Sequence, residues 1–186
     1  MLVSHESPIS MLEDSRNYND YCYALVHLFE THPEYYSFFK QSLLQGREVL
    51  LDNSIFELGH SFDPVKFAKY VEELKPTYYI VPDVLEDSQK TMSSFHKFKM
   101  QYPDLPGLTI GVVQGKTYQQ LVKCYTINGP QIPDAITTFL VLMIPLSVFT
   151  PTTLPFSISK PVAGVSVYVF KAPFSLAVST AKLTTS

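Results

Sequence analysis

The stretch EVLLDNSIFELG (residues 48–59) places an acidic residue at the end of an apolar run. Residues 49–51 are typical of a buried strand, and Asp52 follows them directly, ahead of the polar pair Asn53 and Ser54. A carboxylate at the end of a buried strand costs free energy unless it accepts hydrogen bonds from the following turn or takes part in chemistry. The first question is which of these two roles Asp52 has.

The same pattern recurs along the first two thirds of the chain. Short runs rich in β-branched and aromatic residues end in polar residues, and stretches with helical signals lie between them. The runs are LVSHE (2–6), YALVHLFE (23–30), EVLLD (48–52), YYIVPD (78–83) and TIGVVQ (109–114). Strands that alternate with helices predict βαβ units and a parallel sheet, so the expected fold class is α/β.

Capping residues predict where the helices begin. The expected signals are a capping box of Thr31 and Glu34 with Gly46 after the helix, Asp63 followed by Pro64, and Asp87. The helix after Asp63 is expected to bury one apolar face, made of Val65, Ala68, Val71 and Leu74.

Three polar residues follow three of the expected strands at a constant interval. Asp52, Asp83 and Gln114 are separated by 31 residues in both steps, so each occupies the same place in successive βα units. Ligands bind at the carboxyl ends of the strands in parallel α/β sheets and barrels. We therefore expect these three side chains to lie at one rim.

Two carboxylates and one amide suit a ligand that both donates and accepts hydrogen bonds. A purine edge is such a ligand, because a carboxylate accepts from N1–H and the exocyclic amine while a glutamine amide donates to O6. A carboxylate can also act as acid, base or nucleophile at a glycosidic bond. The alternative is that Asp52 and Asp83 only cap the turns that follow their strands.

Other polar and aromatic residues are weaker candidates. His5 and His27 also end expected strands and are candidates to join the rim, but a single histidine is more often a hydrogen-bonded structural residue. Cys22 and Cys124 are far apart and predict buried thiols rather than a disulfide or a zinc cluster. The aromatic residues at 35, 36, 38 and 39 are expected in the core.

Composition limits the classes of function. The chain has 186 residues, which suits one domain with a full core, and its net charge of −3 gives no overall basic signal for nucleic acid. The first ten residues lack the pattern of a signal peptide, and the longest apolar run is interrupted by Pro145. A soluble protein of the cytoplasm, or of the host cytoplasm if a phage encodes it, is the expectation.

The last 60 residues differ sharply from the rest. Residues 127–186 contain one acid, Asp134, and three lysines, together with many Pro, Ser and Thr residues. Three explanations stay open for this segment: an all-β appendage, a disordered tail, or a sequence translated out of frame. The expected organisation is therefore a βα-repeat region over residues 1–126 and an atypical segment over 127–186.

Three segments carry a resemblance to a known family. LLDNSIFELG (50–59), YYIVPDV (78–84) and IGVVQGKT (110–117), in this order and spacing, resemble the purine-pocket motifs of the tRNA-guanine (queuine) transglycosylases. They look most like the phage and bacterial relatives that insert 7-deazaguanine bases into DNA. The resemblance covers residues 1–126.

The resemblance implies a (β/α)₈ TIM barrel, present here in part as about five N-terminal βα units. It also implies exchange of guanine for a 7-deazaguanine through a covalent intermediate on an aspartate. Asp52 resembles the acid/base aspartate, Asp83 the aspartate that reads the purine N1 and amine edge, and Gln114 the donor to O6. Gly115 would offer a second donor through its N–H, and Phe56 matches the aromatic residue that follows the acid.

The chain departs from the family pattern at several positions. The Ser-Gly-Gly that follows the family's aspartate is replaced by residues 53–55, and Lys116 stands where a second glycine is usual. The family's nucleophilic aspartate and its zinc cluster lie on later segments, and neither is identified here; Asp134 has the wrong setting. The expected site therefore has no metal and no cofactor.

Three hypotheses about function follow. The first is a base-exchanging glycosyltransferase acting on tRNA or DNA, with guanine and a 7-deazaguanine as its bases. The second is a catalytically incomplete remnant that binds a purine. The third is a structural phage-type protein whose β-rich tail mediates assembly. The oligomeric state stays open, with a homodimer as one expectation, and no membrane partner is expected.

Overall fold

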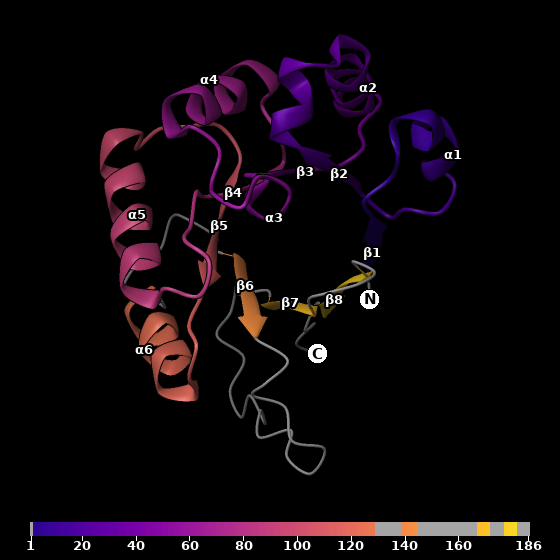
Figure 1. The fold of residues 1–186 in the computed structure, drawn as a ribbon. Coiled ribbons are helices and arrows are strands. Elements are labelled where there is room, and N and C mark those ends of the chain that lie inside the picture. The colour runs from indigo at the N-terminus through magenta and orange to yellow at the C-terminus, as the bar shows by residue number, and fades with distance from the viewer. Residues whose placement is uncertain (1, 129–138, 145–166, 172–176, 182–186) are drawn as a thin grey trace, which may run out of the picture.

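The computed structural model describes residues 2–128, 139–144, 167–171 and 177–181. They form a mixed α/β fold around one curved sheet (Figure 1). The strands are β1 (Leu2–His5), β2 (Cys22–Leu25), β3 (Val49–Asp52), β4 (Tyr78–Ile80), β5 (Leu108–Val113), β6 (Phe139–Ile144), β7 (Val167–Lys171) and β8 (Ala177–Ala181). The helices are α1 (Leu12–Ser15), α2 (Pro33–Leu44), α3 (Ile55–Leu58), α4 (Pro64–Leu74), α5 (Ser88–Gln101) and α6 (Tyr118–Asn128).

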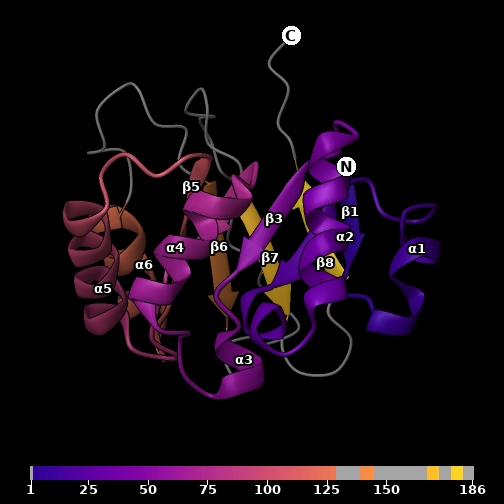
Figure 2. The same cartoon turned by 90° about the horizontal axis from the view of Figure 1, so that it is seen from above.

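Four consecutive strands, β2 to β5, form a parallel sheet in chain order. Helices α2, α4, α5 and α6 lie on the outer side of the curved sheet, as the two views show (Figures 1 and 2). The prediction of alternating strands and helices in a parallel α/β sheet is confirmed for this part of the chain.

The sheet continues beyond β5 and curves back towards its own start. β6 and β7 add in parallel, β8 pairs antiparallel with β7, and β1 pairs antiparallel with β8. β1 also approaches β2 at the other end of the strand order, because Asp20 donates its N–H to the Val3 carbonyl at 2.8 Å and Ser4 Oγ donates to the Tyr21 carbonyl at 2.7 Å. The described strands of the 127–186 segment therefore belong to the same sheet as the rest.

Side chains alternate between the two faces of the parallel strands, so both faces are buried. The outer cluster includes Cys22, Val49 and Tyr79, which pack with helical residues such as Phe39 and Phe67. The inner cluster consists of strand residues and their neighbours, namely Tyr21, Tyr23, Leu25, Leu50, Ile80, Ile110 and Val112. This alternation places Asp52 on the same face as Leu50, at the end of the inner cluster.

Two of the predicted helix starts are confirmed. Asp63 accepts hydrogen bonds from the N–H groups of Val65 and Lys66, both at 2.9 Å, and Asp87 accepts one from Lys90 N–H at 3.0 Å. Both acids occupy the N-cap position, where such acceptors satisfy N–H groups that have no partner inside the helix. Gly46 has a φ of +79°, as expected for a residue just after a helix.

Three finer predictions are wrong. The capping box of Thr31 and Glu34 does not form, because α2 begins at Pro33 with His32 at its N-cap. The run 23–30 is a strand only to Leu25 and then turns into a 3₁₀ helix, Val26–Glu30. Val65 is exposed rather than buried, because the inward face of α4 is formed by Phe67, Ala68, Val71 and Leu74.

Candidate functional site

Asp52 is the last residue of β3, and its carboxylate is held by two donors. The Tyr23 hydroxyl on the neighbouring strand β2 donates to Oδ2, and the Ser54 N–H donates to Oδ1 at 2.6 Å. Ser54 adopts a left-handed conformation with a φ of +60°, which turns the chain sharply after the strand. Asp52 as a whole residue is partly exposed.

The surroundings of Asp52 raise the pKa of its carboxyl to about 7. Burial is the largest cause, since it disfavours the charged form, and the hydrogen bonds from Tyr23 and Ser54 oppose it. The negative charges of Glu57 and Asp83 add smaller effects in the same direction as burial. A carboxyl group with this pKa exists in both protonation states near neutral pH, as a group that exchanges protons with a substrate requires.

Asp83 lies three residues beyond the end of β4 and is almost completely buried. Its Oδ1 accepts from Asn53 Nδ2 at 2.9 Å and its Oδ2 accepts from Gln114 Nε2 at 2.7 Å. Burial raises the pKa of Asp83, and these two hydrogen bonds lower it. The carboxylate therefore joins the ends of three neighbouring strands, β3, β4 and β5.

Asn53 is the central link between the two acids. It follows Asp52 in the chain, is fully buried, and donates to the Val81 carbonyl at 3.1 Å as well as to Asp83. Its own Oδ1 accepts from the Ile55 N–H at 3.1 Å. The Nδ2 group therefore connects the end of β3 with the segment after β4, and Oδ1 holds the turn that follows β3.

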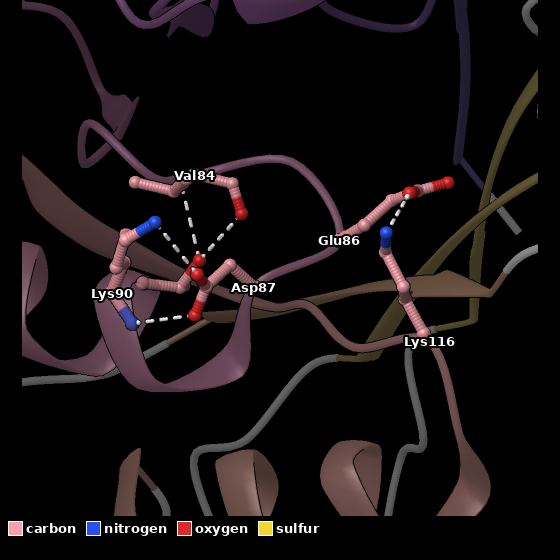
Figure 3. A network of polar contacts seen from close by, with 6 residues as sticks. Val84, Glu86, Asp87, Lys90 and Lys116 are labelled. Carbon is pink, nitrogen blue, oxygen red and sulfur yellow. Dashed lines mark hydrogen bonds and ion pairs between the residues drawn. The ribbon is translucent and has the colours of Figure 1, made fainter.

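Gln114 follows β5 directly and is as buried as Asp83. Its Oε1 accepts from the Glu86 N–H at 3.0 Å, in the loop between β4 and α5. Two further contacts hold the middle of this loop: Thr91 Oγ1 bonds to the backbone of Val84, and the Glu86 carboxylate pairs with Lys116 at 3.3 Å (Figure 3). The loops after β4 and β5 are thus joined to each other, next to the Asp83–Gln114 pair, by the contacts of Glu86 with Gln114 and Lys116.

Gly115 and Phe56 lie close to these residues in sequence but make different contributions. A Cβ atom on Gly115 would approach Gln120 Cβ to 2.8 Å, so the absence of a side chain there lets α6 pack close behind the strand end. Phe56 is 42% exposed on α3. No hydrogen bond, ion pair or ring contact among the described residues joins the Phe56 side chain to Asp52, Asp83 or Gln114, and Gly115 adjoins Gln114 only through the chain.

The structure thus brings three of the five predicted site residues together. Asp83 and Gln114 bond directly, and Asn53, which follows Asp52 in the chain, donates to Asp83. The charge of Asp83 also contributes a small rise to the pKa of Asp52. Sequence reasoning did not identify Tyr23 or Asn53 as site residues. The alternation of side chains along β2 puts residues 23 and 25 on the same face. Leu25 lies opposite Asp52 in the register, so Tyr23 shares the face of Asp52.

The remaining candidates are His5, His27 and the two cysteines. His5 Nδ1 lies 3.0 Å from Asn19 Oδ1, and both cysteines are buried free thiols, as predicted. His27 is half-buried, and its Nδ1 has no hydrogen-bond partner among the described residues. Burial lowers the pKa of His27.

The described part of the chain contains neither a candidate metal site nor a candidate membrane-spanning helix. Within residues 2–128 and the three later strands, no group of His, Cys, Asp and Glu side chains is arranged to hold a metal ion. No helix in the same ranges combines the length and apolar character that a membrane span requires.

Comparison with known proteins adds no relative. None of the protein-family models searched matches the chain, and none of the curated proteins searched is similar enough to count as a match.

Proposed function

We propose that this chain is a base-exchanging glycosyltransferase of the queuine tRNA-ribosyltransferase type, which replaces guanine in nucleic acid by a 7-deazaguanine. One observation carries the proposal: Asp52, a carboxyl group with a pKa of about 7, lies beside a buried Asn53–Asp83–Gln114 chain. The resemblance of residues 50–59, 78–84 and 110–117 to the purine-pocket motifs supports the same assignment.

Asp52 supplies the proton transfers of the exchange. In its protonated form it gives a proton to the departing guanine as the C1′–N9 bond breaks and C1′ bonds to the nucleophilic carboxylate that the resemblance implies. In its ionised form it takes the N9 proton of the incoming deazapurine as the new C1′–N9 bond forms and the bond between C1′ and that carboxylate breaks. The two steps return Asp52 to its starting state, and its pKa of about 7 makes both forms accessible near neutral pH.

Asp83 and Gln114 recognise the base. The Asp83 carboxylate accepts two N–H bonds, from Asn53 and Gln114, and a guanine would offer N–H donors from N1 and its amine in their place. The freed Gln114 amide then donates to O6. Recognition exchanges hydrogen bonds of the same kind, so neither buried side chain is left without a partner.

We further propose that the fold is a variant of the (β/α)₈ barrel. The parallel strands β2 to β5 with helices outside them, and the approach of β1 to β2, support a barrel-like closure. The antiparallel pairing of β8 with β7 and β1 departs from that architecture, in which all strands are parallel. The nucleophile that the resemblance implies would lie on a later strand, and the side chains there are outside the described residues.

A base-exchange assay tests the proposal. Purified protein is incubated with radiolabelled guanine and either unmodified tRNA or double-stranded DNA, and label in the nucleic acid is counted. We expect incorporation into one of the two, at least 100-fold lower in Asp52→Asn because a general acid–base contribution is lost. Asp63→Asn, which changes an N-cap acid on α4, is the matched control and should retain activity. Absence of incorporation into either nucleic acid contradicts the proposal.

Purine binding without exchange is the second candidate. It is favoured by the fact that the Asp83–Gln114 pair is complete in the described part of the chain, whereas no nucleophile is assigned there. Heat released on titration with guanine, together with no incorporation of label, would support this reading over the first.

A further inference from the structure

The Tyr23 phenol is a buried group to which the proposed reaction assigns no role. Tyr23 is 4% exposed in the inner cluster, among Leu25, Leu50 and Ile80, and such a hydroxyl needs a hydrogen-bond partner. It finds that partner in Asp52 rather than in the backbone. The phenol therefore reaches the carboxylate from the inner face of the curved sheet.

The register of the two strands explains how the contact arises. Tyr23 lies opposite Leu50 and Leu25 lies opposite Asp52, and all four side chains share the inner face. The tyrosine side chain is long enough to pass one residue pair along the strand and reach the carboxylate. A phenylalanine at position 23 would fill the same space but would leave Asp52 Oδ2 without this donor.

We propose that Tyr23 is a positioning residue of this site, whose hydroxyl fixes the Asp52 carboxylate and stabilises its ionised form. Tyr23 takes one lone pair of Oδ2 and Ser54 N–H takes one of Oδ1, so each oxygen keeps a lone pair for a substrate. The role in base exchange rests on the proposed function, whereas the effect of Tyr23 on Asp52 does not.

The charges around the pair determine the direction of its titration. Glu6 after β1, Glu57 on α3 and Asp83 after β4 are the acidic groups near Tyr23 and Asp52, and no cation of the described residues contributes to the pKa of either. Burial, the charge of Asp52 and its hydrogen bond to the phenol, and the charges of Glu57 and Glu6 raise the pKa of Tyr23 well above its usual value. The phenol therefore stays protonated and remains a donor across the range in which Asp52 titrates.

Titration of Asp52 in Tyr23→Phe tests the proposal. The carboxyl resonance or the carboxylic-acid infrared band of Asp52, identified by its loss in Asp52→Asn, is followed from pH 4 to pH 9 without any base or nucleic acid. Loss of a hydrogen bond to a charged group is expected to raise the proton affinity of Asp52 about tenfold or more. Tyr79→Phe is the control, because Tyr79 is equally buried but its hydroxyl bonds to Thr109, at 2.9 Å.

The outcomes separate the positioning role from the enzymatic one. An Asp52 titration that moves in Tyr23→Phe and not in Tyr79→Phe establishes the role of Tyr23, even where guanine exchange is absent. An unchanged titration in Tyr23→Phe overturns it, even where exchange is present. If Tyr23→Phe fails to fold, the reciprocal measurement decides: the proposal requires Asp52→Asn to lower the pKa of the Tyr23 phenol, and an unchanged phenol titration overturns it.

Discussion

Gln114 donates its side-chain N–H to the carboxylate of Asp83 at 2.7 Å, and both residues are 3% exposed. This bond joins the ends of β5 and β4 across 31 residues of sequence. The two residues proposed to recognise a base are therefore hydrogen-bonded to each other. Under the proposed function a base would replace this bond, so the stability of the strand ends and the recognition of a base would depend on the same atoms.

The raised pKa of Asp52 predicts how stability depends on pH. An acid whose pKa rises on folding binds its proton more tightly in the folded state, so the free energy of unfolding falls as pH increases from its usual pKa of 3.8 to about 7. Asp52→Asn removes this dependence. The unfolding free energy of the variant relative to the wild type should therefore be about 1–2 kcal/mol higher at pH 8 than at pH 5, a figure lowered because Asp52 is partly exposed. Urea unfolding at the two pH values measures it. A pH dependence identical to that of the wild type would contradict the assigned pKa.

The buried amide of Asn53 predicts a large loss of stability on truncation. Asn53→Ala removes a donor to Asp83 and to the Val81 carbonyl, and leaves the Ile55 N–H without its acceptor. We expect the free energy of unfolding to fall by about 2–4 kcal/mol. Gln101→Ala, an exposed residue at the end of α5, should change it by less than about 0.5 kcal/mol. Similar values for the two variants would show that the Asn53 bonds are not what holds the strand ends.

Two glycines with positive φ differ in the space around them. A Cβ on Gly107 would lie 2.3 Å from the Pro76 carbonyl oxygen, whereas one on Gly46 would meet nothing within 4 Å. Gly46→Ala should therefore cost about 1 kcal/mol for the left-handed backbone alone, and Gly107→Ala more than about 2 kcal/mol. Thermal unfolding compares the two directly. The close approach before β5 would be refuted by equal melting temperatures.

The exposed ion pair between Lys116 and Glu86 should matter little for stability. Both side chains are more than half exposed, so solvent screens their attraction (Figure 3). Lys116→Ala should change the free energy of unfolding by less than about 0.5 kcal/mol in 150 mM salt. A loss above about 1 kcal/mol would mean that the loops after β4 and β5 depend on this pair rather than on the Gln114–Glu86 backbone bond.

Local signals predicted the parts of the fold that depend on neighbouring residues. Asp63 and Asp87 cap helices because an acid needs only the next turn to accept its hydrogen bonds. Thr31 fails as a cap because Pro33 two residues later suits the first helical position and moves the start of α2. The 3₁₀ helix after Leu25 was missed because an apolar run looks the same in a strand and in a buried helix.

The site was predictable only in part for a related reason. The 31-residue interval of Asp52, Asp83 and Gln114 follows from the βα repeat and can be read along the chain. The bonds of Asp52 to Tyr23 and of Asp83 to Asn53 depend instead on strand register and on the left-handed turn at Ser54. Register is set by packing across the whole sheet, so these partners become visible only in three dimensions.

Calorimetric titration with guanine and with adenine tests the central claim most directly. The Asp83 carboxylate and the Gln114 amide match the N1–H, amine and O6 of guanine, whereas adenine lacks N1–H and carries an amine in place of O6. We predict that guanine binds, that adenine binds at least 100-fold more weakly, and that Gln114→Leu reduces the difference by removing the donor to O6. No guanine binding, or equal binding of the two bases, would contradict the assignment of this site to a purine edge.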